Sequence, residues 1–114
     1  MTVPIPAAYT DAPPIIREIN LVLHLVAALR VSSTPERVRE LQLRKAALLD
    51  RIALKTPDDT DAADVAGDAA IELMRQDHGP AEPTGGLTTT LLGIAARHYV
   101  RDQYAAYSNG LPTT

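Results

Sequence analysis

The sequence contains no cysteine, no tryptophan and no phenylalanine. The absence of cysteine excludes disulfide bonds, zinc sites built on thiolates and cysteine nucleophiles. Since four tyrosines are the only aromatic side chains, a core has to be built from Leu, Ile, Val and Ala, a composition that favours helices lying close together. An excess of positive charge is also missing. The net charge of −3 argues against a general nucleic-acid-binding protein.

Long hydrophobic runs are absent as well. The longest uncharged apolar run covers residues 19–29 and includes Asn20 and His24, so it is well short of the ~20 apolar residues that a transmembrane helix needs. The first basic residue, Arg17, follows a proline-rich start, which differs from the basic start of a secretory signal. With 114 residues the chain can form one domain with its own core. These features predict a soluble cytoplasmic protein.

The spacing of apolar residues and the positions of turn residues predict an all-α fold, a small four-helix bundle-like domain. Thr34 suits the N-cap of the second helix, Pro35 its first helical position, and Glu36 the positive end of its dipole. No alternating strand pattern of useful length is present. The predicted helices cover residues 13–31, 35–55, 61–78 and 87–107.

The domain is predicted to span residues 13–108, between a flexible, proline-rich arm at residues 1–12 and a short tail at residues 109–114. In the first helix, apolar residues cover nearly the whole circumference. Because a helix that is apolar all round is usually buried, we expect this helix to lie at the centre of the bundle.

Two opposite charge stripes follow each other along the chain. Residues 30–55 carry seven basic and three acidic side chains, a net charge of +4, whereas residues 58–82 carry eight acidic and one basic, a net charge of −7. The stripes face each other within one molecule or face separate partners. We favour the first arrangement because consecutive helices joined by a short connection are usually neighbours. The basic stripe consists of Arg37, Arg44 and Arg51, and the acidic stripe of Asp61, Asp64, Asp68 and Glu72.

The second predicted helix also carries a smaller apolar stripe, formed by Leu43, Ala47 and Leu54, opposite its main apolar face. A helix with two apolar stripes usually touches two neighbours, and one of these can belong to another molecule. We therefore expect self-association through this stripe. The favoured function is a non-enzymatic interaction module, regulatory or accessory, that binds a protein partner or itself through helix faces.

Two alternatives use the charge stripes. The basic helix at residues 35–55 could contact DNA phosphates, which would make the protein a small DNA-binding regulator. The acidic stripe could instead imitate a phosphate backbone and block a DNA-binding protein.

Residues that carry catalytic or metal chemistry form no convincing site. His98 and Asp102 are spaced i, i+4, but no third metal ligand is evident. The glycine-containing segment at residues 84–90 lacks the GK[ST] ending of a phosphate-binding loop. The sequence therefore predicts no catalytic, cofactor-binding or metal-binding residue, and no cofactor.

The segments PPIIREINLVLHLVAALR (residues 13–30) and KAALLDRIA (residues 45–53) resemble small uncharacterised helical proteins of actinobacterial mobile elements, such as plasmids and integrated elements. The preference for Arg over Lys, nine against two, agrees with a genome of high GC content. The resemblance covers about half of the chain. It implies a cytoplasmic, non-enzymatic accessory or regulatory role and supplies no site residues.

Overall fold

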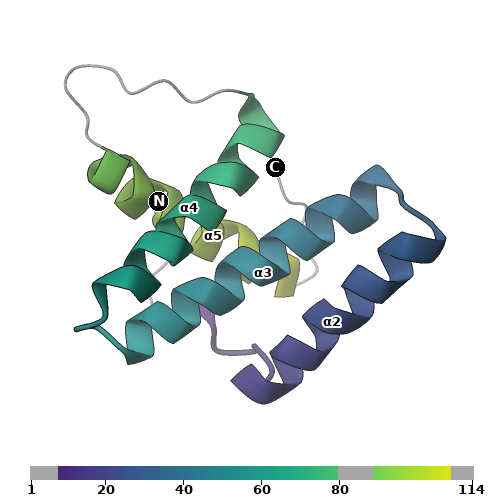
Figure 1. Cartoon of the computed structure of the whole chain (residues 1–114), viewed down its shortest axis with the longest axis horizontal. Helices are drawn as coiled ribbons and strands as arrows, with labels where there is room; N and C mark the ends of the chain where they lie inside the picture. The colour runs from purple at the N-terminus through teal and green to yellow at the C-terminus, as the bar shows by residue number, and fades with distance from the viewer. Residues whose placement is uncertain (1–7, 80–88, 109–114) are drawn as a thin grey trace.

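The computed structural model describes residues 8–79 and 89–108, and every regular element in these two stretches is a helix. The all-α, four-helix bundle-like fold is thus confirmed (Figure 1). Each helix agrees with its predicted bounds within two residues, and residues 87–88 lie outside the described residues. The helices are α2 (Ile15–Val31), α3 (Pro35–Lys55), α4 (Thr60–His78) and α5 (Thr89–Ser108).

Local capping explains where two helices begin. The Thr34 side chain accepts a hydrogen bond from the backbone N–H of Arg37 at 3.2 Å, with Pro35 at the first helical position. The Asp59 side chain does the same for the backbone N–H of Ala62 at 3.0 Å. Each cap satisfies a backbone donor that the first turn of a helix leaves free.

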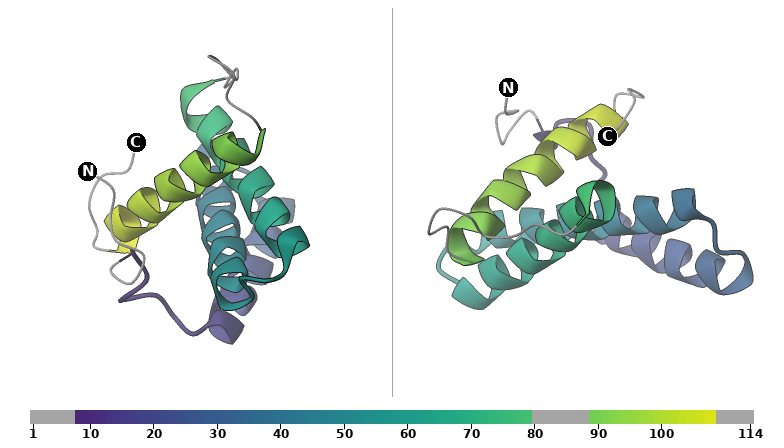
Figure 2. Two further views of the ribbon diagram at one scale, coloured as in Figure 1. Left: turned by 90° about the vertical axis from the view of Figure 1, so that its left-hand side faces the viewer. Right: turned by 90° about the horizontal axis from the view of Figure 1, so that it is seen from above.

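Helix α3, and not α2, occupies the centre of the domain. Figure 1 shows α3 between α2 and α4, and the right-hand view of Figure 2 shows α5 crossing on one side of them. Among the described helices, the backbone of α2 packs closely against α3 alone. The expectation that the first helix is central is therefore wrong, because α3 presents apolar side chains to more than one neighbour while α2 keeps much of its apolar surface exposed.

In the described part of the chain the hydrophobic core lies among α3, α4 and α5, and none of its buried members comes from α2. Where α4 crosses α5, the two backbones meet at Gly67 and Gly93. A Cβ atom placed on Gly67 would lie 3.4 Å from the Gly93 Cα, so the absence of side chains here allows the helices to approach this closely. The buried core residues are Leu43, Ala46, Ala47, Ala70, Ile71, Leu73, Leu92, Ala96, Val100 and Tyr104.

Residues 8–12, predicted as part of a flexible arm, are packed against the domain. Ala8 is buried, Ala12 contacts the core, and the Tyr9 hydroxyl donates a hydrogen bond to the Asp50 carboxylate at 2.5 Å. The predicted boundary after residue 12 is wrong for these five residues, because a buried carboxylate supplies Tyr9 with an anchor. The rest of the predicted arm and the tail at residues 109–114 lie outside the described residues.

Candidate functional site

Helix α2 exposes an unusual amount of apolar surface. Twelve of its 17 residues are apolar, yet the only side chain that it buries fully is Glu18. Ile16 is 73% exposed, Leu23 58% and Val31 88%. Soluble domains usually arrange a helix the other way round, with the apolar stripe inside and the charges outside. A helix that exposes this stripe has an unpartnered binding surface.

Four apolar residues of α2 lie along one line of the helix surface. Ile16, Ile19, Leu23 and Val26 are separated by three, four and three residues, the spacing with which helices pack against each other. Ile16 and Leu23 are exposed and the other two are partly buried. We call these four residues the α2 face. Arg30 continues the same spacing at the end of the helix.

A buried ionic contact attaches α2 to the rest of the domain. The Glu18 carboxylate accepts hydrogen bonds from the Arg44 guanidinium at 3.0 and 3.2 Å and from the Tyr104 hydroxyl at 3.1 Å. Burial of the Tyr104 ring, followed by the nearby Glu18 charge, raises the pKa of Tyr104 to about 12. Tyr104 is therefore a protonated donor at neutral pH. The contact fixes the rotation of α2 and leaves the α2 face turned away from the core.

A second buried carboxylate, Asp50, joins α3 to α5 and to the N-terminal segment. It accepts hydrogen bonds from Arg97 Nε at 2.6 Å, from Arg101 Nε and Nη2 at 2.8 and 2.9 Å, and from Tyr9. Burial opposes the charged form of Asp50, but the hydrogen bonds from Arg101, Tyr9 and Arg97 outweigh it and hold its pKa below the usual value. Each carboxylate oxygen already accepts two hydrogen bonds, so this geometry suits a structural anion better than a general base.

Asp77 repeats this arrangement at the end of α4. Its carboxylate accepts hydrogen bonds from the Arg39 guanidinium at 2.8 and 3.2 Å and from the Tyr99 hydroxyl at 2.5 Å. Burial works against the charge of Asp77, yet the bonds from Arg39 and Tyr99 lower its pKa. Glu18, Asp50 and Asp77 therefore each connect helices of this small domain through arginine and tyrosine.

The predicted pairing of the two charge stripes is wrong. Arg44 pairs with Glu18 and Glu40, and Arg37 donates a hydrogen bond to the backbone oxygen of Ser32 at 3.0 Å. The Arg51 guanidinium lies over the Tyr9 ring, 5.7 Å from its centroid. The basic stripe turns toward α2, α5 and the N-terminal segment instead of toward α4. Within the described part of the chain, the acidic residues Asp61, Asp64, Asp68 and Glu72 are all exposed and form no ion pair.

The stripe Leu43, Ala47 and Leu54 is not the expected self-association surface. Leu43 and Ala47 have no exposed area and belong to the core formed with α4 and α5. Leu54 is partly buried. Because α3 is the central helix, neighbours within the same chain cover this stripe, and apolar side chains are exposed on α2, α4 and α5 instead.

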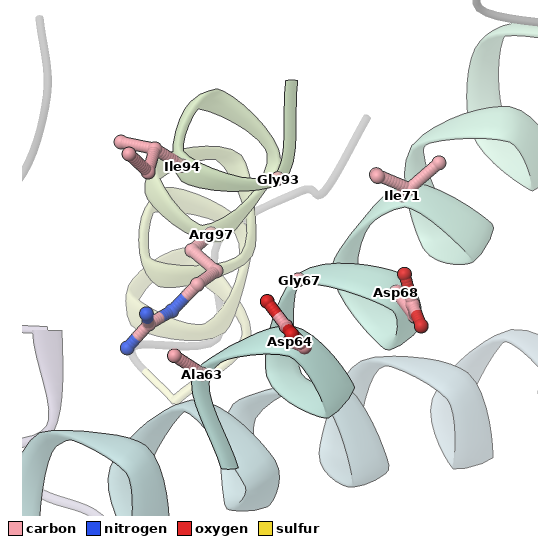
Figure 3. A pocket seen from close by; sticks show the side chains of 8 residues that line it. All are labelled: Ala63, Asp64, Gly67, Asp68, Ile71, Gly93, Ile94 and Arg97. Carbon is pink, nitrogen blue, oxygen red and sulfur yellow. The ribbon is translucent and has the colours of Figure 1, made fainter. Parts of the chain in front are cut away.

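A groove of about 530 Å³ lies between α4 and α5. Figure 3 shows Gly67 and Gly93 at its base, with Asp64 and Asp68 along α4 and Ile94 and Arg97 along α5. Ile94 is half exposed. The sequence reasoning missed this groove, although a glycine in each of two predicted helices was a signal for a close crossing.

Within the residues described, no group of three or more histidine, aspartate or glutamate side chains is placed to hold a metal ion. His98 Nδ1 lies 3.5 Å from Arg101 Nη1, so its neighbour is a cation. Of the glycine-containing segment at residues 84–90, only Thr89 and Thr90 belong to a described helix. In the described ranges, none of the helices has the length and apolar character to cross a bilayer.

Comparison with known proteins found no family model, curated protein or solved structure that matches this chain.

Proposed function

We propose that this protein is a non-enzymatic helical interaction module, an accessory or regulatory protein of the cytoplasm that binds a protein partner through the α2 face. The observation that supports the proposal is that α2 exposes an apolar stripe and buries a glutamate. The resemblance to helical proteins of mobile elements agrees with such a role.

The binding energy available on α2 is sufficient for recognition. Full burial of an Ile or Leu side chain contributes about 1.5–3 kcal/mol, and Ile16 and Leu23 still expose more than half of their surfaces. Apolar anchors spaced along one helix face are what a helix-in-groove complex uses. The Glu18 contact holds the helix in one orientation, which reduces the entropy lost on binding.

The DNA-binding alternative has less support. Arg44 and Arg39 of the basic helix form ion pairs within the domain, so their charges are already compensated before any phosphate approaches. The helix itself is the central one, with neighbours on several sides. Insertion of α3 into a DNA groove would therefore require the bundle to open.

The proposal is tested by affinity capture from the source cell, with the intact protein, Leu23→Glu and the control His24→Glu as baits. Both substitutions add a negative charge at an exposed position of α2, but His24 lies about 100° around the helix from Leu23. We expect partners that the intact protein and the control retain and that Leu23→Glu loses. If every captured protein binds Leu23→Glu equally, the α2 face is not the binding surface.

A further inference from the structure

The exposed charges of α2 are all positive. Arg17 and Arg30 are exposed, whereas Glu18, the only acid of the helix, is buried in its contact with Arg44. Arg30 lies in line with the α2 face, so two copies of the face packed against each other would bring both Arg30 side chains into one interface, with no exposed acid from either helix to pair with them. Like charges placed together in this way oppose association. A symmetric contact between two α2 helices is therefore disfavoured.

The α4–α5 groove has the complementary character. Asp64 and Asp68 line it on α4, and Asp61 and Glu72 extend the negative charge along the same helix. Apolar surface is present as well, because Ile94, which lines the groove, is 50% exposed. The groove volume of about 530 Å³ is large enough for side chains of another molecule. This groove fits an apolar helix whose exposed charges are basic.

Resting on the proposed function of the α2 face, we propose that its partner is a second copy of this chain, whose α4–α5 groove receives the face head to tail. Within one molecule α2 and α4 lie on opposite sides of α3 (Figure 1), so the face does not reach the groove of its own chain. A contact between two different surfaces is heterologous, and it builds a closed ring or an open chain of copies.

Two variants, each lacking one half of the contact, make a sharp test. Leu23→Glu removes the α2 face, and Asp64→Arg with Asp68→Arg reverses the charge of the groove at two exposed positions. The matched controls are His24→Glu on α2 and Asp11→Arg with Glu36→Arg, which makes the same charge change at two exposed acids outside α4. Circular dichroism establishes that each variant keeps its helices, and Ile16→Glu and Ile94→Arg are the replacements where one does not.

Light scattering coupled to size exclusion gives the mass of each species over a range of concentrations. We expect the intact protein and both controls to increase in mass with concentration and to associate less at high salt. Leu23→Glu and the groove variant should each self-associate at least roughly tenfold more weakly than the intact protein. An equimolar mixture of the two variants should form a 1:1 dimer and nothing larger, because only one intact face and one intact groove then remain to meet.

Three results would overturn the inference. The groove variant could associate like the intact protein, which would indicate a symmetric α2 contact. The mixed variants could stay monomeric although the intact protein associates, or the intact protein could stay monomeric at every concentration. None of these results contradicts the proposed function, since capture of another protein that depends on Leu23 would still support it.

Discussion

The replacement of Asp50 by alanine tests the view that buried carboxylates connect this domain. Asp50 is buried and accepts hydrogen bonds from two arginines and one tyrosine. Asp50→Ala leaves Arg101, itself 5% exposed, without the carboxylate that neutralises it. It also leaves the hydroxyl of Tyr9 and the guanidinium of Arg97 without their acceptor. The change thus affects three elements of the fold at once.

The expected loss is large for a domain of this size. Removing one partner of a buried ion pair costs about 3–5 kcal/mol, because the remaining charge stays buried and uncompensated. The whole free energy of unfolding of a small domain is about 5–15 kcal/mol. We expect Asp50→Ala to lower the melting temperature by roughly 10–25 °C. Arg101→Met should cost less, since Asp50 would keep hydrogen bonds from Arg97 and Tyr9.

Urea unfolding followed by circular dichroism measures both variants, with Asp68→Ala as the control for loss of an exposed aspartate. The control should change stability by no more than about 0.5 kcal/mol. If Asp50→Ala costs less than about 1 kcal/mol, or less than Arg101→Met, the carboxylate does not hold the two arginines in the way described, and the reasoning fails.

Three further outcomes follow from the same geometry. Thr34→Ala should destabilise the protein by about 1 kcal/mol through loss of the N-cap of α3, measured by urea unfolding. Gly67→Ala alone should leave the free energy of unfolding unchanged or raise it by up to about 1 kcal/mol. Adding Gly93→Ala should reverse this gain, because the two methyl groups need the same space between α4 and α5. A double-mutant cycle with no coupling energy would contradict this. Asp50 and Asp77 have lowered pKa values in the folded state. The stability that they contribute is therefore present above the pKa of an unfolded aspartate, near 4, and is lost as the pH falls below it. The midpoint of urea unfolding should stay level from about pH 7 to 5 and then decrease.

The helices themselves could be predicted because their signals are local. Thr34 and Pro35 mark the start of α3. The predicted bounds agree with those of the structure because apolar spacing and caps depend only on residues close in the sequence. The placement of the helices relative to each other depends on contacts across the chain, and no local signal specifies them.

The position of Leu43 differs from the one predicted from the sequence. On a helical wheel, Leu43 and Ala47 form the smaller of two apolar stripes of α3, which suggested an outer surface. In the structure this stripe faces α4 and α5 and contains fully buried residues. The small residues Ala46, Ala47 and Ala70 allow the helices to pack closely there. A helical wheel that is judged by its large apolar residues alone does not show that such a stripe can be buried.

The charged residues were misassigned for a related reason. Arg44 was expected to pair with the acidic stripe of the next helix, because consecutive helices joined by a short connection are usually neighbours. Its partner, Glu18, lies 26 residues earlier in the chain, within a helix that otherwise reads as apolar. A single acid in such a helix was the available signal, since a lone carboxylate among apolar residues either is exposed or has a buried partner.

The same glutamate explains why α2 can expose apolar surface without losing its place in the fold. Burial of Glu18 beside Arg44 and Tyr104 fixes which side of α2 faces the domain. The apolar residues on the opposite side are then left to the solvent. Had Glu18 been apolar, α2 could have rotated to bury its largest side chains against α3. A buried ionic contact is weak evidence for added stability, but it can select one arrangement among several. In this protein the selected arrangement leaves the α2 face available for binding.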